Sequence, residues 1–250
     1  MGNIEIIGLH GLPEFDISHD LPKLIYESSL SSAGGIKSGD VIVVTQKIVS
    51  KVEGMVRDLL DVIPTSEASE LADKLGKDPR LVQMILEQSS EIVRTDFDRG
   101  VLITESIHGF ICANAGIDSS NIEGDTKIAL LPRDSNASAK KILKDLKNLS
   151  GIDSIGVIIS DTFGRPWRDG HVNFAIGCAR MSPYIDYKDT VDAVGKVLKV
   201  TTIAVADEFA AASELVTGKS LNIPVVLIRG GEFKPESQDE ESLLRPKEND

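Results

Sequence analysis

The sequence predicts a mixed α/β (α+β) fold, and three observations support this. Short, continuously apolar runs rich in β-branched residues recur at 41–44, 155–159 and 225–228, which is typical of buried strands. Segments with apolar residues at helical spacing separate these runs. Three further short runs between residues 91 and 113 follow one another without a helix, which indicates an antiparallel meander. No Gly-x-Gly-x-x-Gly motif follows a strand, so the pattern does not fit a Rossmann fold.

The first elements are predicted from short local patterns. Residues 4–7 alternate weakly and indicate a strand. Residues 20–30 carry apolar side chains at helical spacing, and Asp20 suits the start of that helix. A Gly-Asp turn then leads into the strand at 41–44. The apolar positions expected mostly on one face of the helix are Leu21, Leu24, Ile25 and Leu30.

A pair of helices is predicted at 66–75 and 79–88. Ser66 is a candidate N-cap for the first helix, and Pro79 suits the first turn of the second. The residues expected to face a core are Leu81, Met84 and Ile85. We interpret the pair, at about 66–89, as a helical insert or an oligomer contact.

The second half of the chain contains the remaining predicted elements and ends in a polar segment. The remaining predicted elements are a strand at 127–131, a basic amphipathic helix at 138–149, one or two strands at 195–205 and a helix at 206–218. Gly218 is a natural residue for ending that helix. Residues 232–250 are polar and charged without periodicity, which predicts a flexible tail. Residues 1–231 are therefore expected to form the folded unit, as one domain or two intertwined lobes.

The composition restricts the class of protein. The chain has 250 residues and a net charge of −12, which is unsuited to non-specific binding of nucleic acid or an anionic membrane. Neither a targeting segment nor an apolar stretch of membrane-spanning length is visible, so we expect a cytoplasmic protein. Cys112 and Cys178 are too few for a disulfide framework and are expected to be reduced packing residues.

The most informative stretch runs from residue 155 to 180. An apolar strand is expected to end at Ser160-Asp161-Thr162, and a loop containing Arg165, Arg168 and the only tryptophan follows. Asp and Thr supply hard oxygen ligands, and Arg supplies a fork of donors for phosphate. This pattern predicts a loop that holds a metal-bound phosphate. The alternative is an Asx-turn with arginines on the surface and the tryptophan in the core.

Two other polar stretches are candidate parts of the same site. Residues 114–121 place Asp118 and Asn121 on one loop among small neighbours, although a helix cap and turn would give the same pattern. Lys47 and Lys51 lie directly beyond the strand at 41–44, where α/β proteins often bind ligands. A solvated strand end is the alternative there.

These residues together suggest a metal-dependent enzyme of nucleotides or phosphates. The four histidines show no metal-ligand spacing, so a carboxylate-bound Mg²⁺ or Mn²⁺ is expected. Thr217-Gly218-Lys219-Ser220 resembles the end of a P-loop, but a P-loop runs from strand to helix and here a helix precedes a strand. The chain is therefore not expected to be a P-loop protein.

Four ordered motifs resemble the coenzyme F420-0:γ-glutamyl ligase family, also called coenzyme F420:L-glutamate ligase. They are Gly11-Leu12-Pro13, residues 114–121, residues 160–168 with 175–177, and Ala206-Asp207-Glu208 before 224–230. The similarity covers about residues 4–231. The resemblance implies an α/β fold particular to that family, and homodimers. It also implies that glutamate is added to the deazaflavin precursor F420-0, with GTP as co-substrate, two divalent cations per active site (Mg²⁺ or Mn²⁺) and assistance from K⁺.

The resemblance also implies roles for individual residues. The metal ligands that match by position are Asp118, Asp161 and Thr162. The nucleotide contacts that match are Leu12, Pro13, Glu14, Phe15, Gln46, Lys47, Lys51, Asn121, Val216, Thr217, Gly218, Lys219 and Ser220. Some members of the family place an acidic or amide residue where this chain has Lys219, and an ammonium group cannot ligate a metal.

The implied reaction passes through an acyl phosphate, which the glutamate amine attacks. Asp161, Lys51 and Arg165 are the residues expected to act in catalysis, the last two by contacting anions. Two other interpretations stay open on the residues alone. One is a different metal-dependent nucleotide phosphohydrolase, and the other is a non-catalytic GTP-binding module.

Overall fold

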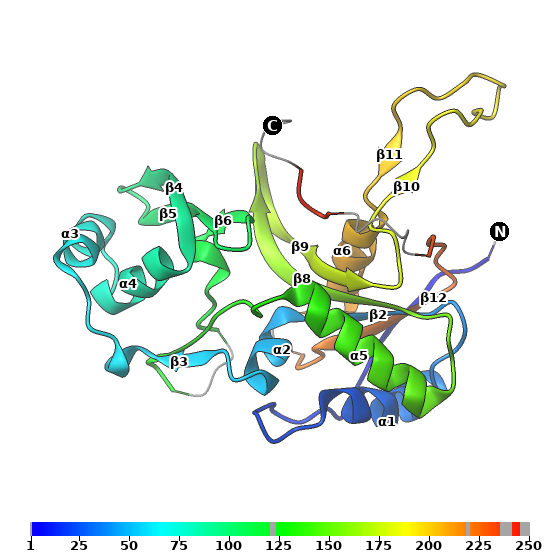
Figure 1. The fold of residues 1–250 in the computed structure, drawn as a ribbon, viewed down its shortest axis with the longest axis horizontal. Helices are drawn as coiled ribbons and strands as arrows, with labels where there is room; N and C mark the ends of the chain where they lie inside the picture. Colours follow the sequence, from blue (N-terminus) through cyan, green and yellow to red (C-terminus); the bar gives the residue numbers. More distant parts are fainter. Residues whose placement is uncertain (1, 121–123, 219–220, 236–241, 246–250) are drawn as a thin grey trace.

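A mixed β-sheet forms the centre of the computed structural model, which describes residues 2–120, 124–218, 221–235 and 242–245. Within these residues the largest sheet has five strands in the order β1-β12-β2-β8-β9 (Figure 1). The β2–β8 pair is parallel and the other neighbours are antiparallel. The strands are β1 (Glu5–Gly8), β12 (Val225–Arg229), β2 (Val41–Thr45), β8 (Gly156–Arg165) and β9 (Arg168–Ala179). This confirms the predicted mixed fold.

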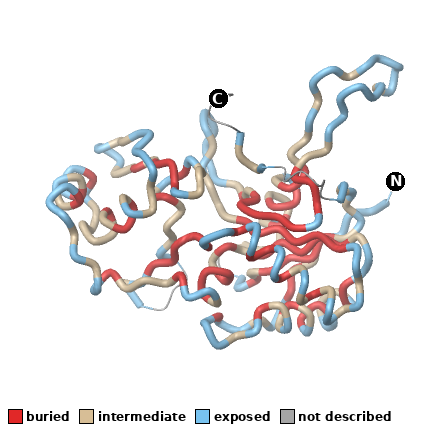
Figure 2. Tube along the Cα trace, viewed as in Figure 1, coloured by how far each residue is buried: buried red, intermediate tan, exposed pale blue. Residues whose placement is uncertain are grey.

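Helices cover both faces of this sheet, which explains why its strands are apolar without alternation. The helices are α1 (Leu21–Ala33) and α5 (Ser135–Ser150) on one face and α6 (Val205–Thr217) on the other. Val157 and Ile159 of β8 pack in the core on the α1 and α5 side, whereas Ile158 packs on the α6 side. Figure 2 shows the buried residues concentrated in the sheet and on the inner sides of these helices.

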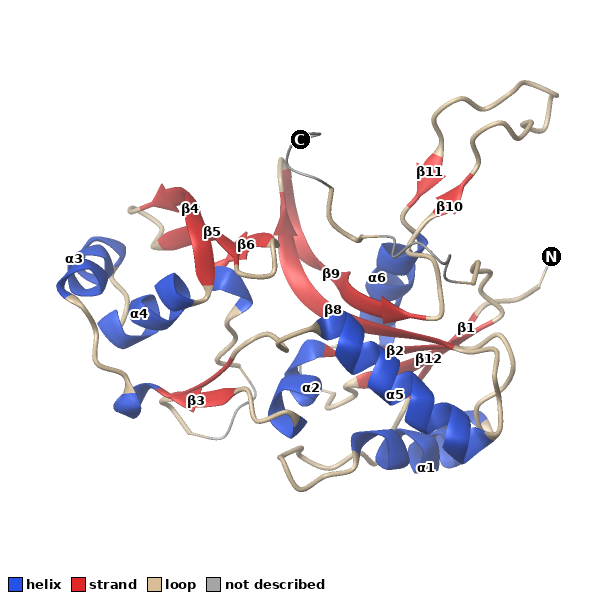
Figure 3. Ribbon diagram, viewed as in Figure 1, coloured by secondary structure: helices blue, strands red, loops and turns tan. Residues whose placement is uncertain are grey.

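A smaller lobe, formed by residues 56–120 and 124–129, packs beside the sheet and has its own apolar cores (Figure 3). Its helices are η1 (Leu59–Asp61), α3 (Ser66–Leu75), α4 (Pro79–Glu87) and η2 (Asn114–Gly116). Its strands are β3 (Val56–Asp58), β7 (Lys127–Ala129), and the antiparallel meander of β4 (Ser89–Asp96), β5 (Val101–Ser106) and β6 (Ile111–Ala113). The predicted helix pair and meander are thus confirmed. Thr65, not Ser66, caps α3, because its Oγ1 accepts a hydrogen bond from the Ala68 amide (3.2 Å).

Helix α2 (Gln46–Val52) connects the two lobes. Gln46 Nε2 and Ser50 Oγ both donate hydrogen bonds to the Leu130 carbonyl, at 2.9 Å and 2.6 Å. Gln46 also donates to Ser50 Oγ (2.8 Å). The polar residues beyond β2 therefore belong to a largely buried helix and not to a solvated strand end.

The stretch after Ile159 differs from the prediction. Strand β8 does not end at Ser160 but continues to Arg165, turns, and pairs back along β9. Thr162 lies opposite Asn173 in this hairpin, so the expected loop is extended strand. The turn residue Trp167 is fully exposed, which excludes the tryptophan as a core residue.

A thin arm, residues 185–203, projects from the sheet (Figure 1). Its strands are β10 (Ile185–Asp186) and β11 (Thr202–Ile203). The prediction of one or two strands over 195–205 was therefore too long, because Val194 and Val200 are 86% and 90% exposed and bury no apolar surface within the chain. At the far end of the chain, the carbonyls of Ser242 and Leu243 each accept a hydrogen bond from Tyr184 Oη (3.1 Å). None of the helices in the described ranges is both long and apolar enough to cross a membrane.

Candidate functional site

A cavity of about 620 Å³ lies between the two lobes, at the carboxyl end of β2. Thr45 and Ser160 are register partners in the parallel β2–β8 pair, and both line this cavity. Ligands in open α/β sheets typically bind outside the carboxyl ends of parallel strands. The position of the cavity follows from the sheet topology.

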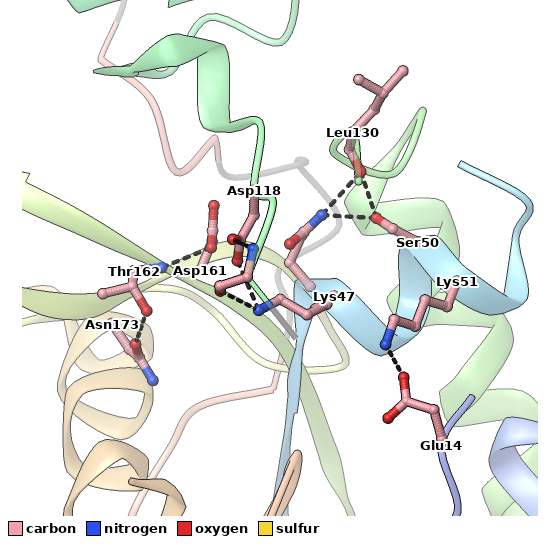
Figure 4. A network of polar contacts seen from close by, with 11 residues as sticks. Glu14, Lys47, Ser50, Lys51, Asp118, Leu130, Asp161, Thr162 and Asn173 are labelled. Atoms are coloured by element: carbon pink, nitrogen blue, oxygen red, sulfur yellow. Dashed lines mark hydrogen bonds and ion pairs between the residues drawn. The ribbon is translucent and has the colours of Figure 1, made fainter. Parts of the chain in front are cut away.

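Most of the site residues expected from the sequence meet in this cavity. Those that line it are Leu12, Pro13, Glu14, Phe15, Gln46, Lys47, Lys51, Asp118, Asp161, Thr162, Thr217 and Gly218. Asp118 comes from the smaller lobe and Asp161 from the central sheet, and their side chains lie near one another beside Lys47 (Figure 4). The two carboxylates thus share a single cavity.

Two expected residues are placed elsewhere. Arg165 is not among the lining residues, because its Nη2 turns back along the hairpin and donates to the Asp169 carbonyl (3.0 Å). Val216 packs against the core on the α6 side of the sheet. Asn121, Lys219 and Ser220 lie outside the described residues.

Asp118 is held by backbone and side-chain contacts together. Its amide and carbonyl both bond to Ala129 (3.1 Å and 2.8 Å), and its Oδ1 accepts from the Ser120 amide (2.7 Å). Its Oδ2 forms an ion pair with Lys47 Nζ (2.8 Å), which also donates to Ser120 Oγ (2.8 Å). Burial raises the pKa of Asp118, but the bonds from Lys47 and Ser120 outweigh burial and hold this pKa below its usual value. Asp118 is therefore a carboxylate at neutral pH.

Asp161 and Thr162 lie side by side on β8. Asp161 Oδ1 accepts from the Thr162 amide (2.8 Å). Thr162 Oγ1 donates its proton to Asn173 Oδ1 (2.8 Å), so the hydroxyl oxygen keeps its character as an acceptor or ligand. Burial, and secondly the charge of Asp161, raise the pKa of the Cys112 thiol on β6 to about 12.

Lys51 is a buried cation on α2. Its side chain is only 7% exposed, and its ammonium group pairs with Glu14, whose side chain is 67% exposed. A buried ammonium group needs such a partner. The segment of residues 12–15 is therefore joined to α2 at the edge of the cavity.

The lining residues that were given no role from the sequence include Asn114, Ser160 and Asn173. Asn114 Oδ1 and Ser160 Oγ are buried and have no hydrogen-bond partner in the described part of the chain. Asn114 and Ala115 also have left-handed backbone, with φ of 53° and 55°. Asn is enriched at positive φ, but a sequence does not show where such a turn occurs. Buried polar atoms without partners and a strained backbone are typical of functional sites.

The donor set of the cavity fits hard divalent cations. The carboxylate residues Glu14, Asp118, Asp161 and Glu214 line the cavity together with hydroxyl and amide side chains, and oxygen ligands are those that Mg²⁺ and Mn²⁺ prefer. Across the described ranges, no group of three or more His, Cys, Asp or Glu residues could by itself hold a metal ion. A cation here would therefore share its coordination with oxygens of a ligand.

Comparisons with known proteins agree over nearly the whole chain. The F420-0:Gamma-glutamyl ligase family matches residues 11–230. A protein of Methanothermobacter thermautotrophicus named coenzyme F420:L-glutamate ligase is 43% identical over 257 positions, covering 99% of this chain and 98% of that protein. Proteins of the same name are 43% identical in Methanocaldococcus jannaschii (99% and 96% covered) and 41% identical in Methanopyrus kandleri (87% and 82% covered). The chain therefore belongs to the F420-0:γ-glutamyl ligase family.

Proposed function

We propose that this protein ligates L-glutamate to F420-0 in a GTP-dependent reaction, giving γ-glutamyl coenzyme F420, GDP and phosphate. Support comes first from the similarity, over 99% of the chain, to proteins named coenzyme F420:L-glutamate ligase. The observation that carries the proposal is that Asp118 and Asp161 line one cavity with Lys47 and Lys51. Carboxylates and ammonium groups in one cavity suit a triphosphate that is bound with divalent cations.

The proposed reaction has two steps. A carboxylate oxygen of F420-0 attacks the γ-phosphorus of GTP, the bond from that phosphorus to the bridging oxygen breaks, and GDP leaves. The amine nitrogen of L-glutamate then attacks the acyl carbon of the resulting acyl phosphate, and phosphate leaves. The glutamate ammonium loses two protons to solvent, one before the attack and one as the amide forms. The protein positions the reactants and stabilises charge, as in other phosphoryl transfers.

The residues of the cavity divide between cation and anion binding. Asp118, Asp161 and Thr162 would hold the two divalent cations, Mg²⁺ or Mn²⁺, which when bound neutralise phosphate charge and align the transferred group. Lys47 and Lys51 would contact phosphate oxygens and leave their present partners, Asp118 and Glu14, to do so. The use of GTP and of K⁺ as an assisting cation rests on the family membership.

The protein is also proposed to act as a homodimer. The arm of residues 185–203 is the part of the surface that supports this. Its exposed apolar side chains are Val191, Val194, Val197 and Val200. An arm that buries so little surface within its own chain is suited to contact a second copy.

Mass spectrometry of a ligation mixture tests the proposed function. The purified protein is incubated with F420-0, L-glutamate, GTP, MnCl₂ and KCl, and a product heavier by one glutamyl unit is expected. Omission of GTP or addition of excess EDTA should abolish this product. GTP hydrolysis without the product would indicate a phosphohydrolase instead. No turnover of GTP with every substrate present would indicate a non-catalytic nucleotide-binding module.

A further inference from the structure

Two groups of residues that line the cavity differ in chemistry. Lys47 and Lys51, both on α2, form a cationic first wall. Asn114 and Ser160 form a second wall, whose polar side chains carry no charge. A triphosphate suits the first wall, so the second wall is available to another group.

Ser160 is the most informative residue of the second wall. It is 1% exposed, its Oγ has no hydrogen-bond partner within the described ranges, and it lines the cavity. Asn114 Oδ1 is also a buried acceptor without a hydrogen-bond partner among the described residues, and Asn114 lines the same cavity. Buried polar atoms in native proteins nearly always have a partner, so two without one in a single cavity point to a ligand.

The two residues come from neighbouring segments. The rings of Phe110, next to β6, and Phe163, on β8, lie 6.1 Å apart between centroids. Strands β6 and β8 are in contact. Asn114 directly follows β6 and Ser160 lies on β8, and both line the cavity. The backbone at Asn114 is left-handed (φ 53°).

We propose that Asn114 Oδ1 and Ser160 Oγ accept hydrogen bonds from the α-ammonium group of the incoming L-glutamate. This inference rests on the proposed ligase function and assigns residues to its nucleophile. An ammonium group has three donors and no acceptor, which complements the two unpartnered oxygens. Asn114 Oδ1 can only accept a hydrogen bond, so an ionised carboxylate, which has no donor, does not suit it.

The position also suits the reaction. The acyl phosphate must form beside Asp161 and Thr162 if these residues hold the divalent cations. Ser160 precedes them directly on β8, so an amine bound there lies next to the acyl carbon it attacks. Asn114 and Ser160 would thus be binding residues for the nucleophile, separate from those for the nucleotide.

Ser160→Ala, with Ser213→Ala as control, tests this assignment. Ser213 is equally buried (1% exposed), donates to the Ala210 carbonyl on α6, and does not line the cavity. Three quantities are measured: KM for L-glutamate, KM for GTP, and trapping of the acyl phosphate by hydroxylamine, which releases phosphate and leaves a hydroxamate. Hydroxylamine is small and neutral and does not need an ammonium site.

The expected result is selective. Ser160→Ala should raise KM for L-glutamate about tenfold, as expected for one hydrogen bond to a charged group, and leave KM for GTP and hydroxamate formation unchanged. Ser213→Ala should leave all three unchanged. A merely structural role of Ser160 would alter all three quantities together.

Asn114 offers a second, independent pair of variants. Asn114→Asp keeps an acceptor oxygen and Asn114→Gly removes it, and both residue types tolerate positive φ. The Gly variant should raise KM for L-glutamate and the Asp variant should retain the wild-type value. This pair decides the question if Ser160→Ala does not fold.

Two outcomes would overturn the inference. One is an unchanged KM for L-glutamate in both Ser160→Ala and Asn114→Gly. The other is loss of hydroxamate formation together with a raised KM for GTP, which would assign this wall to the nucleotide or its cations. These outcomes can be distinguished from failure of the proposed ligase function. In that case the wild-type protein itself would form neither the glutamyl product nor the hydroxamate.

Discussion

Lys47 Nζ and Asp118 Oδ2 lie 2.8 Å apart and join α2 to the smaller lobe across the edge of the cavity. Each of these residues is expected to bind a different part of the same ligand complex, the lysine a phosphate and the aspartate a cation. The ion pair satisfies both charges. Under the proposed function, a metal-bound nucleotide would replace this contact.

Lys47→Met should weaken the binding of GTP in the presence of Mg²⁺ by about tenfold, because a partly buried charge contact with phosphate is lost. The pKa of Asp118 should also rise, since Lys47 is one cause of its depression. Isothermal titration calorimetry measures the affinity. Lys144→Met on the exposed side of α5 is the control, and equal affinities for both variants would contradict the role of Lys47.

Asp161→Ala should abolish ligation with little loss of stability, because the half-buried carboxylate lies at the edge of the core. The product is measured by mass spectrometry, and the fold by thermal unfolding. Asp169→Ala, at the exposed tip of the same hairpin, should keep wild-type activity. If Asp161→Ala ligates at the wild-type rate, its assignment is wrong.

Cys112 should resist alkylation in the folded protein. Burial and the nearby Asp161 charge raise the pKa of its thiol to about 12, so almost no thiolate exists at about pH 8. Iodoacetamide should label Cys112 only after unfolding in guanidinium, as peptide mass spectrometry can determine. Rapid labelling of the native protein would show that β6 does not pack as described.

Asp207→Asn should stabilise the protein at neutral pH. Burial raises the pKa of Asp207 above its ordinary value of 3.8, so ionisation costs the folded state free energy once the pH exceeds the raised value. Asn keeps the oxygen that accepts from the Ala175 amide (3.0 Å). The difference in Tm between variant and wild type should be largest near pH 7 and vanish below about pH 4. A difference independent of pH would contradict this explanation.

The proposed homodimer is tested by light scattering during size-exclusion chromatography. The wild type should have twice the chain mass of 26.9 kDa. Val194→Lys combined with Val200→Lys places charges on the arm and should shift the mass toward that of one chain. Dimers of unchanged stability in this double variant would exclude the arm as the contact.

Much of the fold could be predicted because local signals and burial agree. Strands β2, β8 and β12 were visible as apolar runs, since helices cover both faces of their sheet. Periodicity was less reliable at helix ends. Leu30 and Leu149 fit the apolar stripes of α1 and α5 but are 52% and 41% exposed, because each lies near the end of its helix, beyond the main packing contact.

The charged residues of the candidate site could be predicted from the sequence. Its uncharged residues, whose importance depends on the three-dimensional structure, were missed. Asp118, Asp161 and Lys47 stood out as charged residues beside strands and small neighbours. Ser160 looked like the end of a strand, because a sequence does not show that β8 continues into a long hairpin. The left-handed backbone at Asn114 could not be placed either, because Asn also occurs with ordinary backbone and no local pattern marks this position.

Binding of GTP with and without divalent cations tests the central claim most directly. Calorimetry of the wild type should show GTP binding in MnCl₂ that is lost in excess EDTA. Asp118→Asn and Asp161→Asn, which keep the size of each side chain and remove its charge, should each reduce this Mn²⁺-dependent binding at least tenfold. Equal affinity for GTP in EDTA, or wild-type affinity in both variants, would contradict the claim that these two carboxylates bind a nucleotide through shared cations.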